Sequence, residues 1–326
     1  MDSLAIITSG GDAPGMNAAI RAIVLSCHKK GIECIGFYHG YNGLIDDDYQ
    51  TLTPDMVRPI MQYGGTILKS ARCPQMHTDE GVKSVVKTLQ RHNIKALVVI
   101  GGDGSFRGMM ALQPHWTGRL IGVPATIDND LACTDSTIGF STAVNTATQA
   151  IDKIRDTANA FERVFIVEVM GRHSGHIAFN VGLATAAESI LSFENCPAQD
   201  LAQVKQTLIE QIQTKQQNNH SSFVIVLAEN LWPGGPQGLQ QALHREAHID
   251  SAVCVLGYIQ RGGSPSTEDR ILATELAMEA VEAAFTESGV MIGKEQGRIK
   301  RSCIIGATEQ SKPVDQAIHS VYKLLT

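Results

Sequence analysis

Two aspartates, Asp128 and Asp130, stand two positions apart just after an apolar run at 120–123. The run is typical of a buried strand, and Pro124 should end it because proline has no N–H to donate to a sheet. Open α/β sheets bind their ligands just beyond the carboxyl ends of the strands. On an extended tip there, the two carboxylates can bind a metal, accept a proton or orient a hydroxyl. The alternative interpretation is a polar turn rich in aspartate and asparagine.

Two glycine-rich turns extend the same pattern. Residues 9–15 join a predicted strand at 4–8 to a predicted helix that Gly31 should end. Residues 101–105 follow another apolar run, at 96–100. Glycines between a strand and a helix let backbone N–H groups approach phosphate oxygens, and the helix N-terminus adds a favourable potential. A tight turn without a ligand is the alternative for each.

Two further turn residues carry charge. Glycines flank Asp103 and leave its carboxylate accessible, and Mg²⁺ binds one or two carboxylates together with phosphate oxygens. Arg72 lies on a turn that Pro74 bounds, where an arginine either binds an anion or is simply solvated. Taken together, the turns and the aspartate tip predict a nucleotide site at the carboxyl edge of a parallel sheet.

The elements that must position these residues alternate along the chain. The apolar pattern predicts further strands at 32–37, 163–170, 189–193, 223–228 and 252–257. It predicts helices at 79–91, 138–159, 200–215 and 267–287, another that ends by 187, and an irregular excursion at 38–66. The alternation predicts an α/β fold with two doubly wound three-layer α/β/α (Rossmann-like) domains facing a central cleft.

Composition narrows the class of protein. A chain of 326 residues should hold about two domains. With 27 basic and 33 acidic residues the net charge is -6, which argues against a general nucleic-acid or membrane surface. No apolar run reaches the about 18 residues of a membrane span, and the first residues lack the basic region of a signal peptide. Seven scattered cysteines without a Cys-x-x-Cys pair suit a reducing compartment, so we expect a cytoplasmic protein.

Six motifs carry a resemblance to a known family, and they lie at 8–17, 70–72, 101–105, 126–130, 168–172 and 260–265. In order and spacing the chain resembles the phosphofructokinase family, in particular the short bacterial enzymes of glycolysis. The resemblance implies a phosphotransferase that uses ATP to phosphorylate the 1-hydroxyl of D-fructose 6-phosphate, giving fructose 1,6-bisphosphate. It also implies a nucleotide-binding domain at 1–140 plus 259–306 and a sugar-phosphate-binding domain at 141–258 plus 307–326.

The resemblance assigns roles to single residues. The implied catalytic set is Asp128 as the base that takes the hydroxyl proton, with Arg72, Arg172, Thr126 and Gly11. The implied ATP site is Gly11, Arg72, Cys73, Gly102, Asp103, Gly104 and Ser105, with Asp103 as the Mg²⁺ ligand. The implied sugar-phosphate site is Thr126, Asp128, Asp130, Arg163, Met170, Gly171, Arg172, Glu229, Tyr258 and Arg261. These residue types suit phosphoryl transfer, which needs positioning and charge stabilisation more than covalent chemistry.

The resemblance also implies a homotetramer in which substrate and effector sites lie at subunit interfaces. Arg163 would reach the sugar phosphate of a neighbouring subunit. Arg21, Arg155 and Glu188 match the family's effector site, which binds ADP or phosphoenolpyruvate. Basic residues expected there are replaced by Leu25 and, in a looser alignment, by Pro54, Asn218 and His220, so we expect a weak response to those effectors.

The phosphate donor and the acceptor depend on four positions. Pyrophosphate-dependent relatives carry Asp where this chain has Gly104 and Lys where it has Ala125, so the resemblance favours ATP. The bacterial enzymes carry Arg where this chain has Ala252 and His where it has Tyr258, and both grip the sugar's 6-phosphate. Alternatives are therefore a kinase for tagatose 6-phosphate or sedoheptulose 7-phosphate, use of pyrophosphate, and a catalytically weak regulatory homologue.

Overall fold

The structure, a computed structural model, describes residues 3–217, 222–310 and 312–325. The chain divides into two compact units. Unit 1 comprises Met1–Ile127, Leu131–Thr142 and Arg261–Lys312. Unit 2 comprises Asp128–Asp130, Ala143–Gln260 and Pro313–Thr326. None of the described helices is both long and apolar enough to cross a membrane.

Unit 1 is built on a seven-stranded sheet in the order β11-β10-β5-β4-β1-β2-β3. Its strands are β1 (Ser3–Ser9), β2 (Glu33–Phe37), β3 (Tyr49–Thr51), β4 (Ile94–Gly101), β5 (Arg119–Pro124), β10 (Val290–Glu295) and β11 (Arg298–Cys303). The five strands from β10 to β2 run parallel, and the edge strands β3 and β11 are antiparallel to their neighbours. The parallel centre of this sheet follows from the strand-helix alternation of the sequence.

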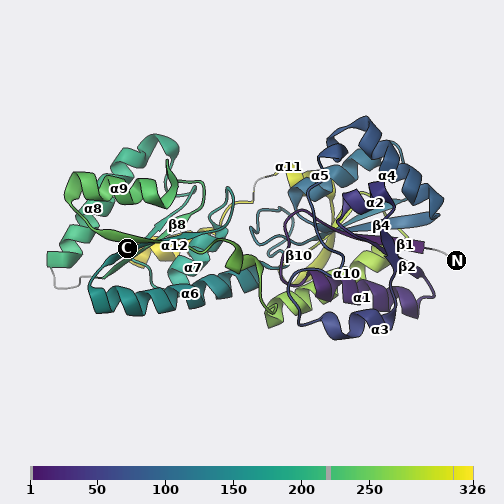
Figure 1. Ribbon diagram of the computed structural model, residues 1–326, viewed down its shortest axis with the longest axis horizontal. Helices are drawn as coiled ribbons and strands as arrows, with labels where there is room; N and C mark the ends of the chain where they lie inside the picture. The colour runs from purple at the N-terminus through teal and green to yellow at the C-terminus, as the bar shows by residue number, and fades with distance from the viewer. Residues whose placement is uncertain (1–2, 218–221, 311, 326) are drawn as a thin grey trace. The chain divides into compact units, whose positions relative to one another are not determined.

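Helices cover both faces of this sheet (Figure 1). One face carries α1 (Met16–Lys29), α3 (Pro54–Val57) and α10 (Thr267–Ala283). The other carries α2 (Tyr41–Asp46), α4 (Asp79–Arg91) and α5 (Asp103–Leu112). The single-turn helices η1 (Arg58–Ile60) and η2 (Pro74–His77) and the short α11 (Ile304–Glu309) complete the unit.

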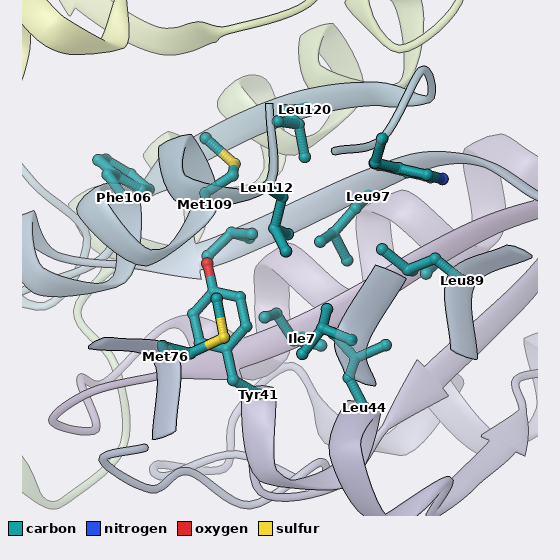
Figure 2. Close-up of a cluster of buried hydrophobic side chains, with 14 of the residues drawn as sticks. Ile7, Tyr41, Leu44, Met76, Leu89, Leu97, Phe106, Met109, Leu112 and Leu120 are labelled. Atoms are coloured by element: carbon teal, nitrogen blue, oxygen red, sulfur yellow. The ribbon is translucent and has the colours of Figure 1, made fainter. Parts of the chain in front are cut away.

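The central strands are apolar throughout because both of their faces are buried. Figure 2 shows one face, where Ile7 and Leu97 of the sheet meet side chains from α2, α4 and α5 such as Leu44, Leu89 and Met109. On the other face the buried Ile6 and Val98 alternate with them, and α1 presents a fully buried stripe. Such a strand holds the turn at its carboxyl end rigidly in place.

Unit 2 has an all-parallel four-stranded sheet in the order β7-β8-β6-β9. Its strands are β6 (Val164–Val169), β7 (Ser189–Leu191), β8 (Phe223–Ala228) and β9 (Ser251–Val255). Its helices are α6 (Phe140–Phe161, which begins in unit 1), α7 (His176–Ala184), α8 (Leu201–Gln217), α9 (Gly235–Ala247) and α12 (Gln316–Leu325). The single-turn helices are η3 (Ala198–Asp200) and η4 (Gly257–Arg261).

Two layers of helices also enclose the smaller sheet. In Figure 1, α8 and α9 lie on one face and α6, α7 and α12 on the other. Ile166 and Ile225 of the strands form a core with Ile212 of α8 and Leu239 and Leu243 of α9. The predicted α/β architecture is therefore confirmed in each unit.

Some elements were not predicted. The excursion at 38–66 contains α2, β3, α3 and η1, which are too short to show a hydrophobic period. The hairpin of β10 and β11 was missed because β11 is mostly exposed and carries Arg298, Lys300 and Arg301. Helix α9 was missed because it begins at Gly235 and Pro236, residue types that are typical of turns.

Candidate functional site

The first glycine turn lies between β1 and α1. Gly10 and Gly15 have positive φ angles of 88° and 111°, which glycine adopts without strain. Gly15 precedes α1, whose N-terminus has no side-chain cap. The hydroxyl of Ser70 donates to the carbonyl of Gly10 at 2.7 Å, and Gly10 N donates to the carbonyl of Ala71 at 3.3 Å. The turn before Arg72 is therefore fastened to the glycine turn.

Arg72 and Cys73 follow this contact. The side chain of Arg72 is exposed, and no partner of its guanidinium is found in the described parts of the chain. Cys73 packs against the core of unit 1, and burial raises the pKa of its thiol. Arg72 is thus available to an anion, whereas Cys73 stays a neutral thiol at neutral pH.

The second glycine turn joins β4 to α5. A Cβ added at Gly101 would lie 2.6 Å from the carbonyl oxygen of Ser9, so the two turns touch and only glycine fits there. At Gly104 no heavy atom lies within 4 Å of an added Cβ, so the space beside this residue is open. Asp103 is the first residue of α5, and its Oδ1 accepts from Nε of Arg107 at 2.9 Å.

Arg261 lies against the first glycine turn. Its Nη1 donates to the carbonyl of Asp12 at 3.0 Å and would stand 2.6 Å from a Cβ added at Gly11. Arg261 therefore belongs with the residues predicted to hold ATP, in unit 1, whereas most of the residues predicted to hold the sugar phosphate lie in unit 2.

The strand that leads to the aspartate tip ends at Pro124, as predicted. Thr126 accepts through its carbonyl from the hydroxyl of Thr137 at 2.6 Å. A Cβ added at Gly102 would lie 3.4 Å from Cβ of Thr126, which places Thr126 beside the second glycine turn. The three predicted phosphate-side segments of unit 1 therefore meet at the carboxyl edge of its sheet.

The tip itself is not extended, and that prediction was wrong. Residues 127–128 form a turn, and Asn129 has a left-handed φ of 52°. Asparagine tolerates this conformation better than most residues. Asp128 is 7% exposed, and its carbonyl accepts from the hydroxyl of Ser174 in unit 2 at 2.9 Å. The turn lets the chain place Asp128 and Asp130 with unit 2 while Thr126 stays with unit 1.

In unit 2, Glu229 holds the loop after β6. Its Oε1 accepts from the N–H groups of Gly171 at 3.2 Å and of Arg172 at 2.7 Å. Arg172 has a left-handed φ of 60°, and Asn230 donates to its carbonyl at 3.1 Å. The carboxylate thus fixes a strained loop, and the side chain of Arg172 is exposed.

Three residues of this loop region were not predicted as site residues. Ser174 and Asn230 bind the tip and the loop, as described above. Gln260 accepts through Oε1 from Met170 N at 3.3 Å. All three lie next to predicted site residues. Their polar side chains, which follow strands, could have marked them as site candidates in the sequence.

The remaining candidates for the sugar phosphate are spread along the sheet of unit 2. Arg163 is exposed at the amino end of β6, away from Met170 at the other end. Ala252 lies in the same half of the sheet, since it pairs with Phe165. Tyr258 follows the carboxyl end of β9 and is 81% exposed.

The predicted effector residues in unit 2 form an ion-pair cluster. Arg155 Nη1 lies 3.0 Å from Glu188 Oε1, and Nη2 donates to the carbonyls of Thr185 and Ala186. Lys215, which was not predicted, also donates to Glu188. Burial raises the pKa of Glu188, but the hydrogen bonds from Lys215, Val224 N and Arg155 outweigh it and bring that pKa below its usual value.

The other effector positions lie elsewhere or are not described. Arg21 and Leu25 are on α1, and Pro54 begins α3, all in unit 1. Asn218 and His220 lie outside the described residues.

A metal ion at this site would have one predicted carboxylate ligand, Asp103. Within 3–217, 222–310 and 312–325, no group of three or more His, Cys, Asp or Glu side chains could hold a metal ion. Mg²⁺ does not need such a group when phosphate oxygens complete its coordination. Asp103, beside the open space at Gly104, fits that role.

A cavity of about 590 Å³ lies at the opposite edge of the larger sheet. Ile94 and Arg119, the first residues of β4 and β5, line it together with Trp116 and Phe285. None of the predicted site residues lines this cavity.

Comparison with known proteins agrees with the motifs. A family model described as phosphofructokinase matches residues 3–284. The ATP-dependent 6-phosphofructokinase 1 of Thermus thermophilus is 46% identical over 326 residues, 100% of this chain and 99% of that protein. The ATP-dependent 6-phosphofructokinase of Clostridioides difficile is 44% identical over 330 residues, 100% of both chains.

A solved structure has the same fold. Phosphofructokinase from Saccharomyces cerevisiae matches with a TM-score of 0.87 at 29% identity, covering 100% of this chain. The match covers 46% of the yeast chain, so this chain spans less than half of its length. By family model and by full-length identity, this chain belongs to the phosphofructokinase family.

Proposed function

We propose that this chain is an ATP-dependent 6-phosphofructokinase, a glycolytic kinase that transfers the γ-phosphoryl group of ATP to the 1-hydroxyl of fructose 6-phosphate. The observation that carries the proposal is the 46% identity over the full length of a relative named for this activity. Asp103, Asp128, Asp130, Arg72 and Arg172 are all present. An inactive homologue would have been free to lose a base or a phosphate ligand.

Unit 1 serves as the nucleotide-binding domain in this proposal. The backbone of Gly11 and of residues 102–105 contacts the phosphates of ATP, as glycine turns before helices do. Arg72 and Cys73 complete the site, and the open space at Gly104 accommodates the α-phosphate and the nucleoside. Arg72 carries no competing partner among the described residues, so its planar guanidinium is free to bind phosphate oxygens.

Asp103 holds Mg²⁺ in this proposal. Bound there, Mg²⁺ would supply positive charge that stabilises the negative charge of the phosphates. The exposed Arg107 shares Oδ1 of Asp103 across one helical turn. That pair is the kind of surface contact worth roughly 0–1 kcal/mol, so it gives way easily when a metal binds.

Asp128 accepts the proton of the sugar's 1-hydroxyl, and Thr126 and Asp130 orient the sugar and the transferred phosphoryl group. A positioned general base of this kind contributes about 10²- to 10⁴-fold to the rate. Arg72 and Arg172 stabilise the charge that spreads over the phosphoryl oxygens. The hydrogen bonds of Glu229 to the loop N–H groups support this role, because they fix the backbone that carries Arg172.

Unit 2 serves as the sugar-phosphate-binding domain. Met170, Gly171, Arg172, Glu229 and Tyr258 contact the sugar phosphate from the carboxyl edge of its sheet. Arg163, which is exposed at the opposite edge, contacts the sugar phosphate of a neighbouring subunit in a homotetramer. Arg261 was also predicted to hold the sugar phosphate, and in unit 1 its guanidinium lies against the first glycine turn.

A second candidate acceptor follows from Ala252 and Tyr258. The two side chains that bind the 6-phosphate in the bacterial enzymes, Arg at 252 and His at 258, are missing here. Each hydrogen bond from a charged group of this kind contributes roughly 1.5–3 kcal/mol to binding. Tagatose 6-phosphate and sedoheptulose 7-phosphate are the competing substrates. Arg245 at the end of α9 and His248 just after it precede the amino end of β9, where Ala252 lies, and are basic residues that could replace the missing contact.

A crossed activity assay tests the proposal. ATP and pyrophosphate are each combined with fructose 6-phosphate, tagatose 6-phosphate and sedoheptulose 7-phosphate, and the products are identified. Turnover should be greatest with ATP and fructose 6-phosphate. Preference for pyrophosphate or for another sugar would replace the proposed activity, and turnover with no pair would favour the non-catalytic homologue.

A further inference from the structure

A buried carboxylate behind the candidate site has no part in the chemistry proposed above. Asp269 lies on α10 in unit 1 and is 1% exposed. Its Oδ1 accepts from Gly139 N at 2.8 Å, and its Oδ2 accepts from both the N–H, at 2.8 Å, and the hydroxyl of Thr142. A buried charge is costly to keep unless hydrogen bonds surround it, and these three donors supply them.

The donors belong to one short segment, residues 137–142, at the start of α6. The other end of this segment is bonded to the residues that precede the aspartate tip. Ile138 N donates to the carbonyl of Pro124 at 3.0 Å, and the hydroxyl of Thr137 donates to the backbone carbonyl of Thr126 at 2.6 Å. Ala125 and Ile138 form a parallel bridge, so the segment extends the sheet beside Thr126.

The same segment packs against the first glycine turn. A Cβ added at Gly139 would lie 2.6 Å from Cβ of Ala13. A Cβ added at Gly15 would lie 2.6 Å from Cγ2 of Ile138. The segment therefore contacts both the turn that carries Gly11 and the strand end that carries Thr126. Between the segment and the glycine turn there is no space for an added side chain at Gly15 or Gly139.

We propose that Asp269 is a positioning residue for phosphoryl transfer, acting by holding residues 137–142 so that the Gly11 turn and Thr126 keep their relative places. The proposal rests on the function proposed above. Misplacing reacting groups by about 1 Å can cost on the order of 100-fold in rate, so a remote carboxylate that fixes this geometry matters for turnover. A carboxylate that merely capped α6 would affect stability and leave turnover per folded molecule unchanged.

The test replaces Asp269 by the nearly isosteric asparagine. In Asp269→Asn one of the two carboxylate oxygens becomes an NH₂ group, so the N–H of either Gly139 or Thr142 loses its acceptor. We expect kcat per folded molecule to fall roughly 10- to 100-fold while KM for fructose 6-phosphate changes little. Amide hydrogen exchange should speed up in residues 137–142 and 10–15, with the protection of β4 unchanged.

Two further variants frame the result. Glu268→Gln makes the same acid-to-amide change one residue earlier, on an exposed side chain. Its oxygen accepts from the hydroxyl of Ser141 at 3.4 Å, and glutamine retains an oxygen that can do so, so this variant should match the wild type. Thr142→Val removes only the hydroxyl that Asp269 and Ser266 N share, and should give a smaller fall in kcat. Because Asp269 and the Thr142 hydroxyl hold the same segment, the losses of the double variant should be less than additive in free energy.

Wild-type kcat in Asp269→Asn, or exchange that rises throughout unit 1, would overturn the proposal. Equal losses in Glu268→Gln would do the same. If Asp269→Asn does not fold, Thr142→Val carries the test through its kcat and its exchange at 137–142. If the wild type has no turnover, the proposed function fails, while local exchange in Asp269→Asn still decides whether Asp269 holds the segment.

Discussion

At the scale of single residues, the absence of a side chain at Gly104 leaves space for a ligand beside Asp103. The surroundings of Gly104 are open, and it lies in the first turn of α5 with an ordinary helical φ. A side chain at this position therefore acts on the ligand and leaves the fold intact. The sequence already indicated this position as one that separates ATP from pyrophosphate as the donor.

Gly104→Asp should lower kcat/KM for ATP on the order of 100-fold, because juxtaposing like charges costs several kcal/mol. Steady-state kinetics with varied ATP measure this. Gly104→Ala is the control for folding: alanine is favoured over glycine in a helix by roughly 0.5–1 kcal/mol, so it should be at least as stable as the wild type and lose less ATP use than the aspartate variant. An aspartate variant that uses ATP normally would contradict the placement of the phosphates.

Ala252 and Tyr258 lie at opposite ends of β9 and should act separately on the sugar phosphate. Adding the missing charges in Ala252→Arg/Tyr258→His should lower KM for fructose 6-phosphate about tenfold or more, since each charged hydrogen bond contributes roughly 1.5–3 kcal/mol. Ala252→Gln/Tyr258→His keeps a long side chain at 252 without its charge and should gain less. An unchanged KM would mean that other groups already hold the 6-phosphate.

At the scale of elements, the sites rest on strand ends that the sequence marks clearly. Strands β1, β4 and β5 are apolar on both faces, so their ends and the turns after them were predictable. The turn at 127–128 was considered only as the alternative to an extended tip, since a sequence rich in aspartate and asparagine is compatible with both. The hydrogen bonds that Glu229 accepts from Gly171 N and Arg172 N were also not predicted, since these residues lie 58 and 57 positions from Glu229 in the sequence.

The cluster of Arg155, Glu188 and Lys215 should stabilise unit 2. Removing the carboxylate in Glu188→Gln leaves two cations without their partner and should cost roughly 3 kcal/mol of unfolding free energy at pH 7. Because the folded-state pKa of Glu188 lies below its unfolded value, the wild type gains this stability above about pH 4.3 and loses it as pH falls further. The difference between the two proteins should therefore shrink at acid pH.

Chemical unfolding of both proteins at several pH values measures the effect of Glu188→Gln. Glu246→Gln is the matched control, because it breaks the more exposed pair of Glu246 with Lys205 and should cost at most about 1 kcal/mol. A Glu188→Gln cost that is equally small, or one that does not change with pH, would show that the cluster does not stabilise the fold.

At the scale of the whole molecule, the family and the architecture could be predicted from the sequence, whereas long-range contacts could not. The six motifs and the strand-helix alternation identified a phosphofructokinase with two α/β units. The antiparallel edge strands were not predicted, because β3 has only three residues, all exposed, and β11 is charged and mostly exposed. The contacts of Arg261 with Asp12, of Asp269 with Gly139 and of Glu188 with Lys215 were not predicted, because each joins residues that are distant in the sequence.

The central claim is phosphoryl transfer from ATP to fructose 6-phosphate with Asp128 as the base. The most direct measurement is kcat of the wild type and of Asp128→Asn with these two substrates, together with the binding of each substrate. We expect a wild-type kcat of about 1–100 s⁻¹. In Asp128→Asn we expect kcat to fall about 10²- to 10⁴-fold, with binding of both substrates retained. An Asp128→Asn protein that turns over as fast as the wild type would show that Asp128 is not the base.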